Sequence, residues 1–209
     1  KDCIKAEGEK WLSNLSDDRM RTAKTGQWWL GSPQRALANN SSAYTEKPEI
    51  EIFLKEWLTL IESKSGERGI FNRVSATKKA ASTGRRKTEG IALGTNPCGE
   101  IYLRSCGFCN LSEVVIRPED DLESLTEKVR LASIIGTFQS TLTDFRYIRN
   151  IWKKNAEEER LLGVSLTGIM DHPILSQVTK DAEMWFTLLR ATAINTNKEW
   201  AEKLGIEQS

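Results

Sequence analysis

The sequence predicts an α/β fold, in which long helices cover a parallel sheet or barrel. Two long segments, residues 118–152 and 176–204, have helical character. Between them lies an apolar run at residues 161–166, which is short for a helix and typical of a buried parallel strand. Because parallel strands need crossover connections, strands that alternate with long helices favour this layout.

The composition permits a buried core and indicates no strongly charged surface. Of the 209 residues, 39% are hydrophobic and 28% charged, so wholesale disorder is not expected. Thirty basic and 29 acidic residues give a net charge of +1, so we expect neither nucleic acid nor a membrane as a partner. No apolar run approaches the roughly 20 residues that span a bilayer, and the amino end is not a signal peptide. We expect a soluble, cytoplasmic protein.

The first residues predict a helix followed by an irregular link. The polar residues before Gly26 are expected to be helical around Ile4, Trp11 and Leu12, with the link at residues 27–33. The chain begins with Lys and its last residues continue a helical pattern. We therefore interpret it as a segment of something longer.

A second helix is expected to begin at Pro48, because a missing N–H costs nothing in the first turn of a helix. Apolar residues recur along one face of this helix and predict core packing: Ile50, Phe53, Leu54, Trp57, Leu58 and Ile61. Gly66 is expected to end it. Residues 75–90, which are basic or small, are interpreted as a solvated, mobile loop.

The second half of the chain is expected to start extended and to become helical. Residues 91–115 are short, extended and broken by glycines. The acidic residues 119–121 suit the positive amino end of the long helix that follows. The inner face of that helix is predicted from its apolar and small residues: Leu122, Leu125, Val129, Ala132 and Gly136. Gly205 is expected to cap the last helix.

A loop in the middle of the chain carries the candidate chemistry. In an extended chain, side chains two residues apart lie on one face, so Asn96, Cys98 and Glu100 are expected to project together. Pro97 favours an extended backbone at the residue before it, and Gly99 has no side chain to block close approach. An amide, a thiol and a carboxylate in a row can hold a hydroxyl, release a hydrogen and take a proton.

Three of the four cysteines cluster, which indicates metal or redox chemistry rather than a spread disulfide framework. A turn near Gly107 is expected to bring Cys109 back beside Cys98. Cys106 and Cys109 form a C-x-x-C pair, for which half a zinc site is the alternative, although a second ligand pair is missing. The only histidine, His172, is interpreted as structural or exposed, and we assign no metal ligand.

Five stretches, in order along the chain, resemble the ribonucleotide reductases. The sequence Asn-Pro-Cys-Gly-Glu at residues 96–100 resembles their Asn-x-Cys-x-Glu finger-loop motif. Residues 35–41, 69–73, 109–114 and 159–168 agree with it. The last two stretches are most similar to the adenosylcobalamin-dependent class, so adenosylcobalamin is the expected cofactor.

The resemblance implies a role for each matched residue. Cys98 matches the cysteine that becomes a thiyl radical and removes the 3′-hydrogen of the ribose, and Glu100 matches the base that takes the 3′-hydroxyl proton. Asn96 matches the amide that binds the substrate hydroxyls. Cys109 matches one member of the dithiol that reduces the sugar, whereas Cys3 has no matching context.

The resemblance also implies a fold and partners. The chain, residues 1–209, would be one fragment of a ten-stranded α/β barrel with a finger loop at about residues 94–110, and its flanking barrel parts are missing. We expect a ribonucleoside diphosphate or triphosphate as substrate, a dithiol reductant such as thioredoxin, and the remaining barrel segments on another chain or on lost flanks.

Two assignments keep alternatives. Asn39, Asn40 and Ser41 are expected to touch substrate or to shape the barrel floor. The basic residues of the loop at 75–90 are expected to be solvated, or to contact substrate phosphates or the nucleoside part of the cofactor. For the whole chain, the alternative to a catalytic segment is a non-catalytic remnant or assembly chain that pairs with another barrel part.

Overall fold

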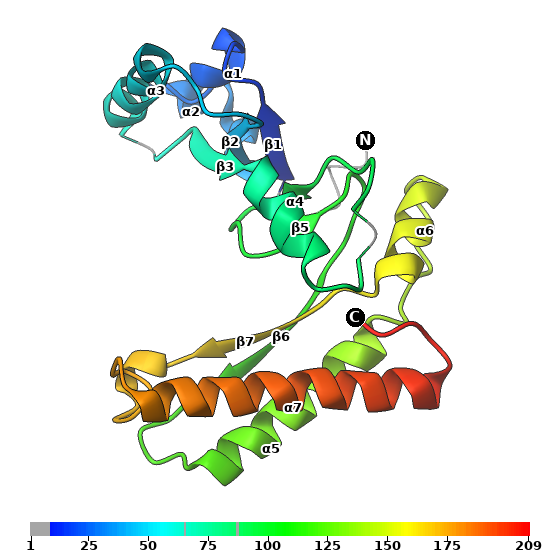
Figure 1. Ribbon diagram of the computed structural model, residues 1–209. Coiled ribbons are helices and arrows are strands. Elements are labelled where there is room, and N and C mark those ends of the chain that lie inside the picture. The colour runs from blue at the N-terminus through cyan, green and yellow to red at the C-terminus, as the bar shows by residue number, and fades with distance from the viewer. Residues whose placement is uncertain (1–8, 65, 87) are drawn as a thin grey trace. The chain divides into compact units, whose positions relative to one another are not determined.

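The computed structural model describes residues 9–64, 66–86 and 88–209, which belong to two compact units (Figure 1). The N-terminal unit spans Lys1–Ser105 and the C-terminal unit Cys106–Ser209. Among the described residues, the strands form one three-stranded and two two-stranded sheets. The two sheets that pair strands across a helical crossover are parallel. The predicted α/β class is therefore confirmed, while the ten-stranded barrel stays an expectation.

A three-stranded parallel sheet organises the N-terminal unit. Its strands are β1 (Glu9–Ser13), β2 (Ala38–Tyr44) and β3 (Gly69–Asn72), with β2 in the centre. The predicted helix around Trp11 and Leu12 is wrong, because both residues lie in β1 and pair with β2. Ile4 lies outside the described residues. Pairing with a distant strand overrides the local preference of so short a segment.

Helices connect these strands and follow the last of them. Residues before Gly26 include α1 (Asp18–Arg21), and the predicted irregular link holds α2 (Trp28–Gly31), followed by a 3₁₀ helix, η2 (Pro33–Leu37). The helix expected from Pro48 is confirmed as α3 (Ile50–Ser63), which ends at Lys64 in the left-handed conformation. The predicted loop at 75–90 is wrong in its first part, which is helical in α4 (Arg73–Ala81). There the Asn72 side chain accepts the N–H of Ser75 at 2.9 Å and caps the helix.

The apolar stripe of α3 is not core, contrary to the prediction. Ile50, Leu58 and Ile61 are 66%, 59% and 65% exposed. Within the stripe, Phe53 is partly buried and contacts the sheet, with its ring centroid 6.4 Å from that of Tyr44 on β2. Periodicity shows that a helix has an apolar side, but the neighbouring elements decide which side is covered.

A buried ionic cluster ties α1, α3 and the segment before β3 together. Glu56 accepts hydrogen bonds from Arg21 Nε at 2.5 Å and from Arg68 Nη2 and Nε at 2.7 and 2.9 Å. Arg68 also donates to Ser13 Oγ at 3.0 Å, at the end of β1. Burial raises the pKa of the Glu56 carboxyl, but the hydrogen bonds and charges of Arg68 and Arg21 outweigh burial, so the net pKa is below its usual value. Burial and then Glu56 raise the pKa of Tyr44.

The C-terminal unit packs helices against a two-stranded parallel sheet. Its strands are β6 (Asn110–Val115) and β7 (Leu162–Thr167), so the strand predicted at 161–166 is confirmed, although most of its residues are only partly buried. The helices are α5 (Leu122–Gln139), α6 (Asn150–Glu159), the 3₁₀ helix η3 (Ile169–Asp171) and α7 (Lys180–Leu204). Figure 1 shows α5 and α7 along one side of the sheet.

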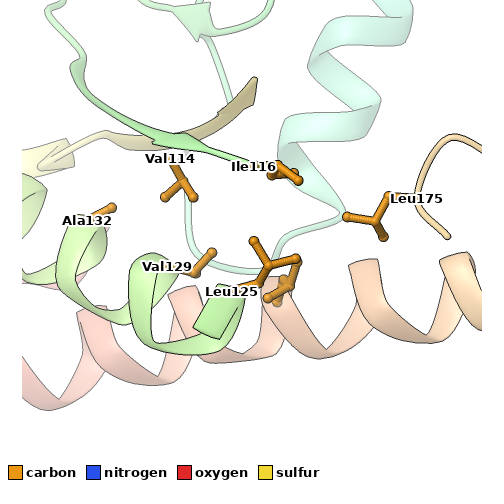
Figure 2. Close-up of a cluster of buried hydrophobic side chains, with 7 residues drawn as sticks. Val114, Ile116, Leu125, Val129, Ala132 and Leu175 are labelled. Carbon is orange, nitrogen blue, oxygen red and sulfur yellow. The ribbon is translucent and has the colours of Figure 1, made fainter. Parts of the chain in front are cut away.

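The core of this unit forms between the sheet and these helices. Figure 2 shows Val114 and Ile116 from the β6 segment facing Leu125, Val129 and Ala132 of α5, with Leu175 beside them. Of the inner face predicted for the helix, every member except Leu122 is buried.

The helix ends follow local signals. Asp121 accepts the Ser124 N–H at 2.8 Å and caps α5, as its acidic start predicted. The single helix predicted over 118–152 is wrong, because α5 ends before Ser140 and α6 begins at Asn150. At the end of α5, Ser140 Oγ donates to the carbonyl of Thr137 at 2.7 Å. Gly205, with φ of 65°, caps α7 as predicted.

His172 has a structural role. It is 1% exposed, and its Nε2 lies 2.9 Å from the carbonyl oxygen of Asp120. Its Nδ1 accepts the N–H groups of Ile174 and Leu175, both at 3.2 Å. Both ring nitrogens are therefore engaged by backbone, which confirms the structural interpretation.

Among the described residues, no helix is long and apolar enough to cross a membrane.

Candidate active-site loop

The candidate loop is the tip of a hairpin. Strands β4 (Gly94–Thr95) and β5 (Tyr102–Leu103) pair antiparallel. Between them, the Asn96 N–H donates to the Ile101 carbonyl at 3.2 Å, and the Gly99 N–H donates to the Asn96 carbonyl at 3.2 Å. The prediction of an extended chain at this point is wrong: residues 96–99 form a β-turn with Cys98 at its third position.

The turn has a sequence signal that the prediction of an extended loop missed. Asparagine at the first position, proline at the second and glycine at the fourth are the preferences of a type I turn. The third residue of a type II turn has a positive φ, whereas that of a type I turn has a negative φ. Cys98, which stands at this position, is not among the described residues with positive φ, so the turn fits type I. Pro97 favours an extended backbone at Asn96, and the chain reverses after it.

Asn96 and Glu100 meet across this turn rather than along one face of a strand. Asn96 is only 8% exposed. Its Oδ1 accepts the N–H groups of Gly99 at 3.2 Å and Ile101 at 3.1 Å, while its Nδ2 donates to Glu100 Oε1 at 2.5 Å. Two of the three predicted loop residues are thus in direct contact.

Cys98 is exposed at the tip of the turn and forms no disulfide. Glu100 is also exposed. The arrangement offers an accessible thiol two residues from a carboxylate whose orientation is held by an amide. A thiol can release a hydrogen atom and a carboxylate can accept a proton, so both groups that the predicted chemistry needs are available at the surface of this unit.

The hairpin is held on one face of the three-stranded sheet. A Cβ at Gly94 would lie 2.8 Å from Leu12 Cδ1, so β4 lies close against β1. The ring of Tyr102 packs edge-on against Phe71 of β3, with centroids 6.5 Å apart. A larger residue at position 94 would therefore require the Leu12 side chain to move.

Two arginines donate hydrogen bonds to backbone carbonyls of the hairpin and of the residue that precedes it. Arg73 Nε donates to the Leu93 carbonyl at 2.9 Å, and Arg86 Nη1 donates to the Tyr102 carbonyl at 2.7 Å. Neither arginine was expected to have this role from the sequence. Arg86 comes from the basic segment interpreted as solvated, so at least this part of it is bound to the loop.

The structure separates the three candidate substrate residues of β2. Ala43 packs with Phe71 and Leu12 on the face that carries the hairpin, whereas Tyr44 packs on α3. By strand alternation, Asn39 and Ser41 share the hairpin face and Asn40 the opposite one. There Asn40 Nδ2 donates to the Met20 carbonyl at 2.5 Å, and its backbone N–H to Glu67 at 3.1 Å. Asn39 is exposed, and Ser41 is buried against Gly69.

The remaining described cysteines lie at the start of the C-terminal unit. The turn lies at residues 105–106 rather than at Gly107. Cys106, with φ of 59°, has its carbonyl bound by Asn155 Nδ2 at 3.1 Å and its sulfur 3.3 Å from Arg149 Nη2. Cys109 directly precedes β6 and is partly exposed.

The relation between Cys98 and Cys109 stays a prediction, because the two residues belong to different units. Cys3 lies outside the described residues. Within residues 9–64, 66–86 and 88–209, no group of three or more histidine, cysteine, aspartate or glutamate residues could hold a metal ion.

The chain is similar to curated proteins of one kind. It is 30% identical over 174 residues to an adenosylcobalamin-dependent ribonucleoside-triphosphate reductase of Lacticaseibacillus paracasei, covering 80% of this chain and 22% of that protein. It is 28% identical over 172 residues to the protein of the same name from Levilactobacillus brevis, with 80% and 22% covered, and 38% identical over 79 residues to that of Lactobacillus acidophilus, with 37% and 10% covered.

The chain thus spans about a fifth of the length of the first two relatives that it matches. No family model matches the chain. No solved structure matches it either.

Proposed function

We propose that this chain, which is a segment related to the adenosylcobalamin-dependent ribonucleotide reductases, carries the loop on which such an enzyme forms the substrate radical. In this proposal it takes part in the conversion of ribonucleotides to deoxyribonucleotides. One observation carries it: the hairpin tip exposes the thiol of Cys98 two residues from Glu100, whose carboxylate accepts a hydrogen bond from Asn96 Nδ2 at 2.5 Å.

Each group has one task in the proposed reaction. Cys98, as a thiyl radical, takes the 3′-hydrogen atom of the ribose and becomes a thiol. Glu100 takes the proton of the 3′-hydroxyl, which a carboxylate can accept. The 2′-hydroxyl leaves as water with a proton from the reducing dithiol, and Cys109 with a second cysteine of the enzyme supplies two electrons by closing a disulfide, which leaves the second dithiol hydrogen on the 2′ carbon. Glu100 returns its proton to the 3′ oxygen, and Cys98 returns a hydrogen atom to the 3′ carbon and becomes a thiyl radical again. A dithiol reductant such as thioredoxin then reopens the disulfide.

Adenosylcobalamin is the proposed source of the radical, because the relatives are named for their dependence on it. When bound, this cofactor supplies the radical that takes the hydrogen atom of a thiol. The exposure of Cys98 fits that chemistry, since a buried thiol would not be reachable from outside the unit.

The substrate and the remaining parts of the site follow from the relatives. Their names favour a ribonucleoside triphosphate over a diphosphate. Asn39 and Ser41, on the face that carries the hairpin, are better placed to line a substrate site than Asn40. The chain spans about a fifth of these relatives, so we propose that further segments of the enzyme complete the site and hold the phosphates.

An assembly role is the second candidate. The exposed apolar stripe of α3, which includes Ile50, Leu58 and Ile61, favours it, because large exposed apolar patches mark interaction surfaces. The intact Asn96, Cys98, Glu100 and Cys109 favour catalysis, since an assembly chain does not need them.

Replacement of Cys98 by serine tests the choice. In the assembled enzyme that contains this chain, with adenosylcobalamin and 3′-tritiated nucleotide, Cys98→Ser should abolish release of the label. An O–H bond is too strong for the radical exchange that a thiol permits. Cys106→Ser serves as the matched control and should release label at the rate of the unmodified enzyme. Label release by Cys98→Ser at that same rate would refute the catalytic proposal and support the assembly role.

A further inference from the structure

We propose that Asn96 is a positioning residue with two separate tasks: its side-chain oxygen holds the turn that presents Cys98, and its side-chain nitrogen orients Glu100. This inference rests on the proposed function, in which Glu100 is the base. It differs from the role implied by resemblance, in which the amide binds the substrate hydroxyls.

The hydrogen-bonding capacity of Asn96 is mostly used inside the loop. A carboxamide oxygen has two lone pairs, and the Asn96 oxygen accepts from Gly99 N–H at 3.2 Å and Ile101 N–H at 3.1 Å. Thr95 Oγ1 lies 3.4 Å from the same oxygen. Of the two amide hydrogens, one goes to Glu100 at 2.5 Å. Asn96 is only 8% exposed. One amide hydrogen is left for a partner outside the loop.

The contact with Glu100 matters because that side chain is exposed. A free glutamate on a surface samples many rotamers, and ordering it costs conformational entropy. The hydrogen bond from Asn96 selects rotamers that keep one carboxylate oxygen at the turn. A general base must reach the proton that it takes within about 2.6–3.2 Å, so this restriction favours proton transfer.

Two substitutions separate the two tasks. Asn96→Ser keeps an acceptor suited to the first position of a turn, but its side chain is too short to reach Glu100. Asn96→Ala removes both functions. Asn195→Asp, on the exposed side of α7, is the control for a substitution at a solvent-facing asparagine.

The first measurement is hydrogen exchange of the Gly99 and Ile101 amides in the isolated chain. The exchange rate of these amides does not depend on catalysis. Asn96→Ala should accelerate exchange at the Ile101 amide by about tenfold or more, because its acceptor is lost, and should accelerate it less at Gly99, whose N–H also donates to the Asn96 backbone carbonyl at 3.2 Å. Asn96→Ser and Asn195→Asp should stay within about threefold of the unmodified chain. Unchanged exchange in Asn96→Ala would overturn the turn-holding task.

The second measurement is steady-state kinetics of the assembled enzyme. Asn96→Ser should lower kcat and the rate of 3′-label release by about tenfold to a hundredfold, with KM within about threefold, because the base is less often in place. A higher KM with unchanged kcat would instead make Asn96 a substrate ligand and overturn the orienting task. Failure of the proposed function would show separately, as label release by Cys98→Ser, while the exchange result would stand.

Discussion

Arg68 donates two hydrogen bonds to the carboxylate of Glu56, at 2.7 and 2.9 Å, in the interior of the N-terminal unit. The two side chains are 1% and 7% exposed. Two parallel N–H···O bonds between a guanidinium and a carboxylate are the strong form of this contact. Since Glu56 lies on α3 and Arg68 also bonds to the end of β1, the pair joins the helix to the sheet that carries the hairpin.

Glu56→Gln should strongly destabilise the chain. The substitution leaves two buried guanidinium groups, of Arg68 and Arg21, without their shared negative charge, and breaking a buried pair on one side costs about 3–5 kcal/mol. Glu62→Gln, at an exposed position of the same helix, should change the free energy of unfolding by less than about 0.5 kcal/mol. Urea unfolding measures both. Equal effects of the two variants would contradict the importance of the pair.

The same carboxylate predicts a loss of stability in acid. The folded-state pKa of Glu56 lies below its usual value, so the unfolded chain binds the proton more readily. The stabilisation is therefore fully present above the unfolded pKa of about 4.3 and is lost as the pH falls through the lower folded pKa. Urea unfolding at a series of pH values below about 5 should show a steeper decline for the unmodified chain than for Glu56→Gln. Parallel curves would exclude this contribution.

Gly168→Ala should disrupt the C-terminal unit. Gly168 has φ of 78°, and a Cβ there would lie 2.4 Å from the backbone oxygen of Ile116. The substitution combines backbone strain with a collision against atoms that cannot rotate away, and should cost about 3 kcal/mol or more. Gly205→Ala is the matched control, because φ is 65° but no atom lies within 4 Å, so it should cost about 1–2 kcal/mol. Thermal unfolding compares the two, and an equal cost would show that the close approach does not matter.

Cys109→Ser should divide the proposed reaction into two stages. Label release from 3′-tritiated nucleotide should persist, because Cys98 is intact, while deoxynucleotide formation should stop, because a lone thiol cannot close a disulfide. Both products are measured in one incubation with the assembled enzyme and a dithiol reductant. Cys106→Ser should form deoxynucleotide at the unmodified rate. Normal product formation by Cys109→Ser would remove this residue from the proposed dithiol.

The loop has a different geometry from the one on which its candidate residues were selected. Strand alternation singled out Asn96, Cys98 and Glu100, but the Asn-Pro-x-Gly pattern folds as a turn. The Asn-Pro-x-Gly pattern is itself a sequence signal for a turn, and the prediction of an extended chain did not take it into account. The partners of Asn96 follow from the turn and were not visible from spacing alone.

The sequence by itself determined the α/β class, the helices α3 and α7, the parallel strand β7 and the resemblance to the ribonucleotide reductases. These depend on local information: helical periodicity, capping residues such as Asp121 and Gly205, and short motifs. Tertiary structure alone decided that Trp11 lies in a strand, that the apolar stripe of α3 is exposed, and that Arg73 and Arg86 hold the hairpin. Each of these depends on contacts between residues far apart in the chain, whose pairing no local preference specifies.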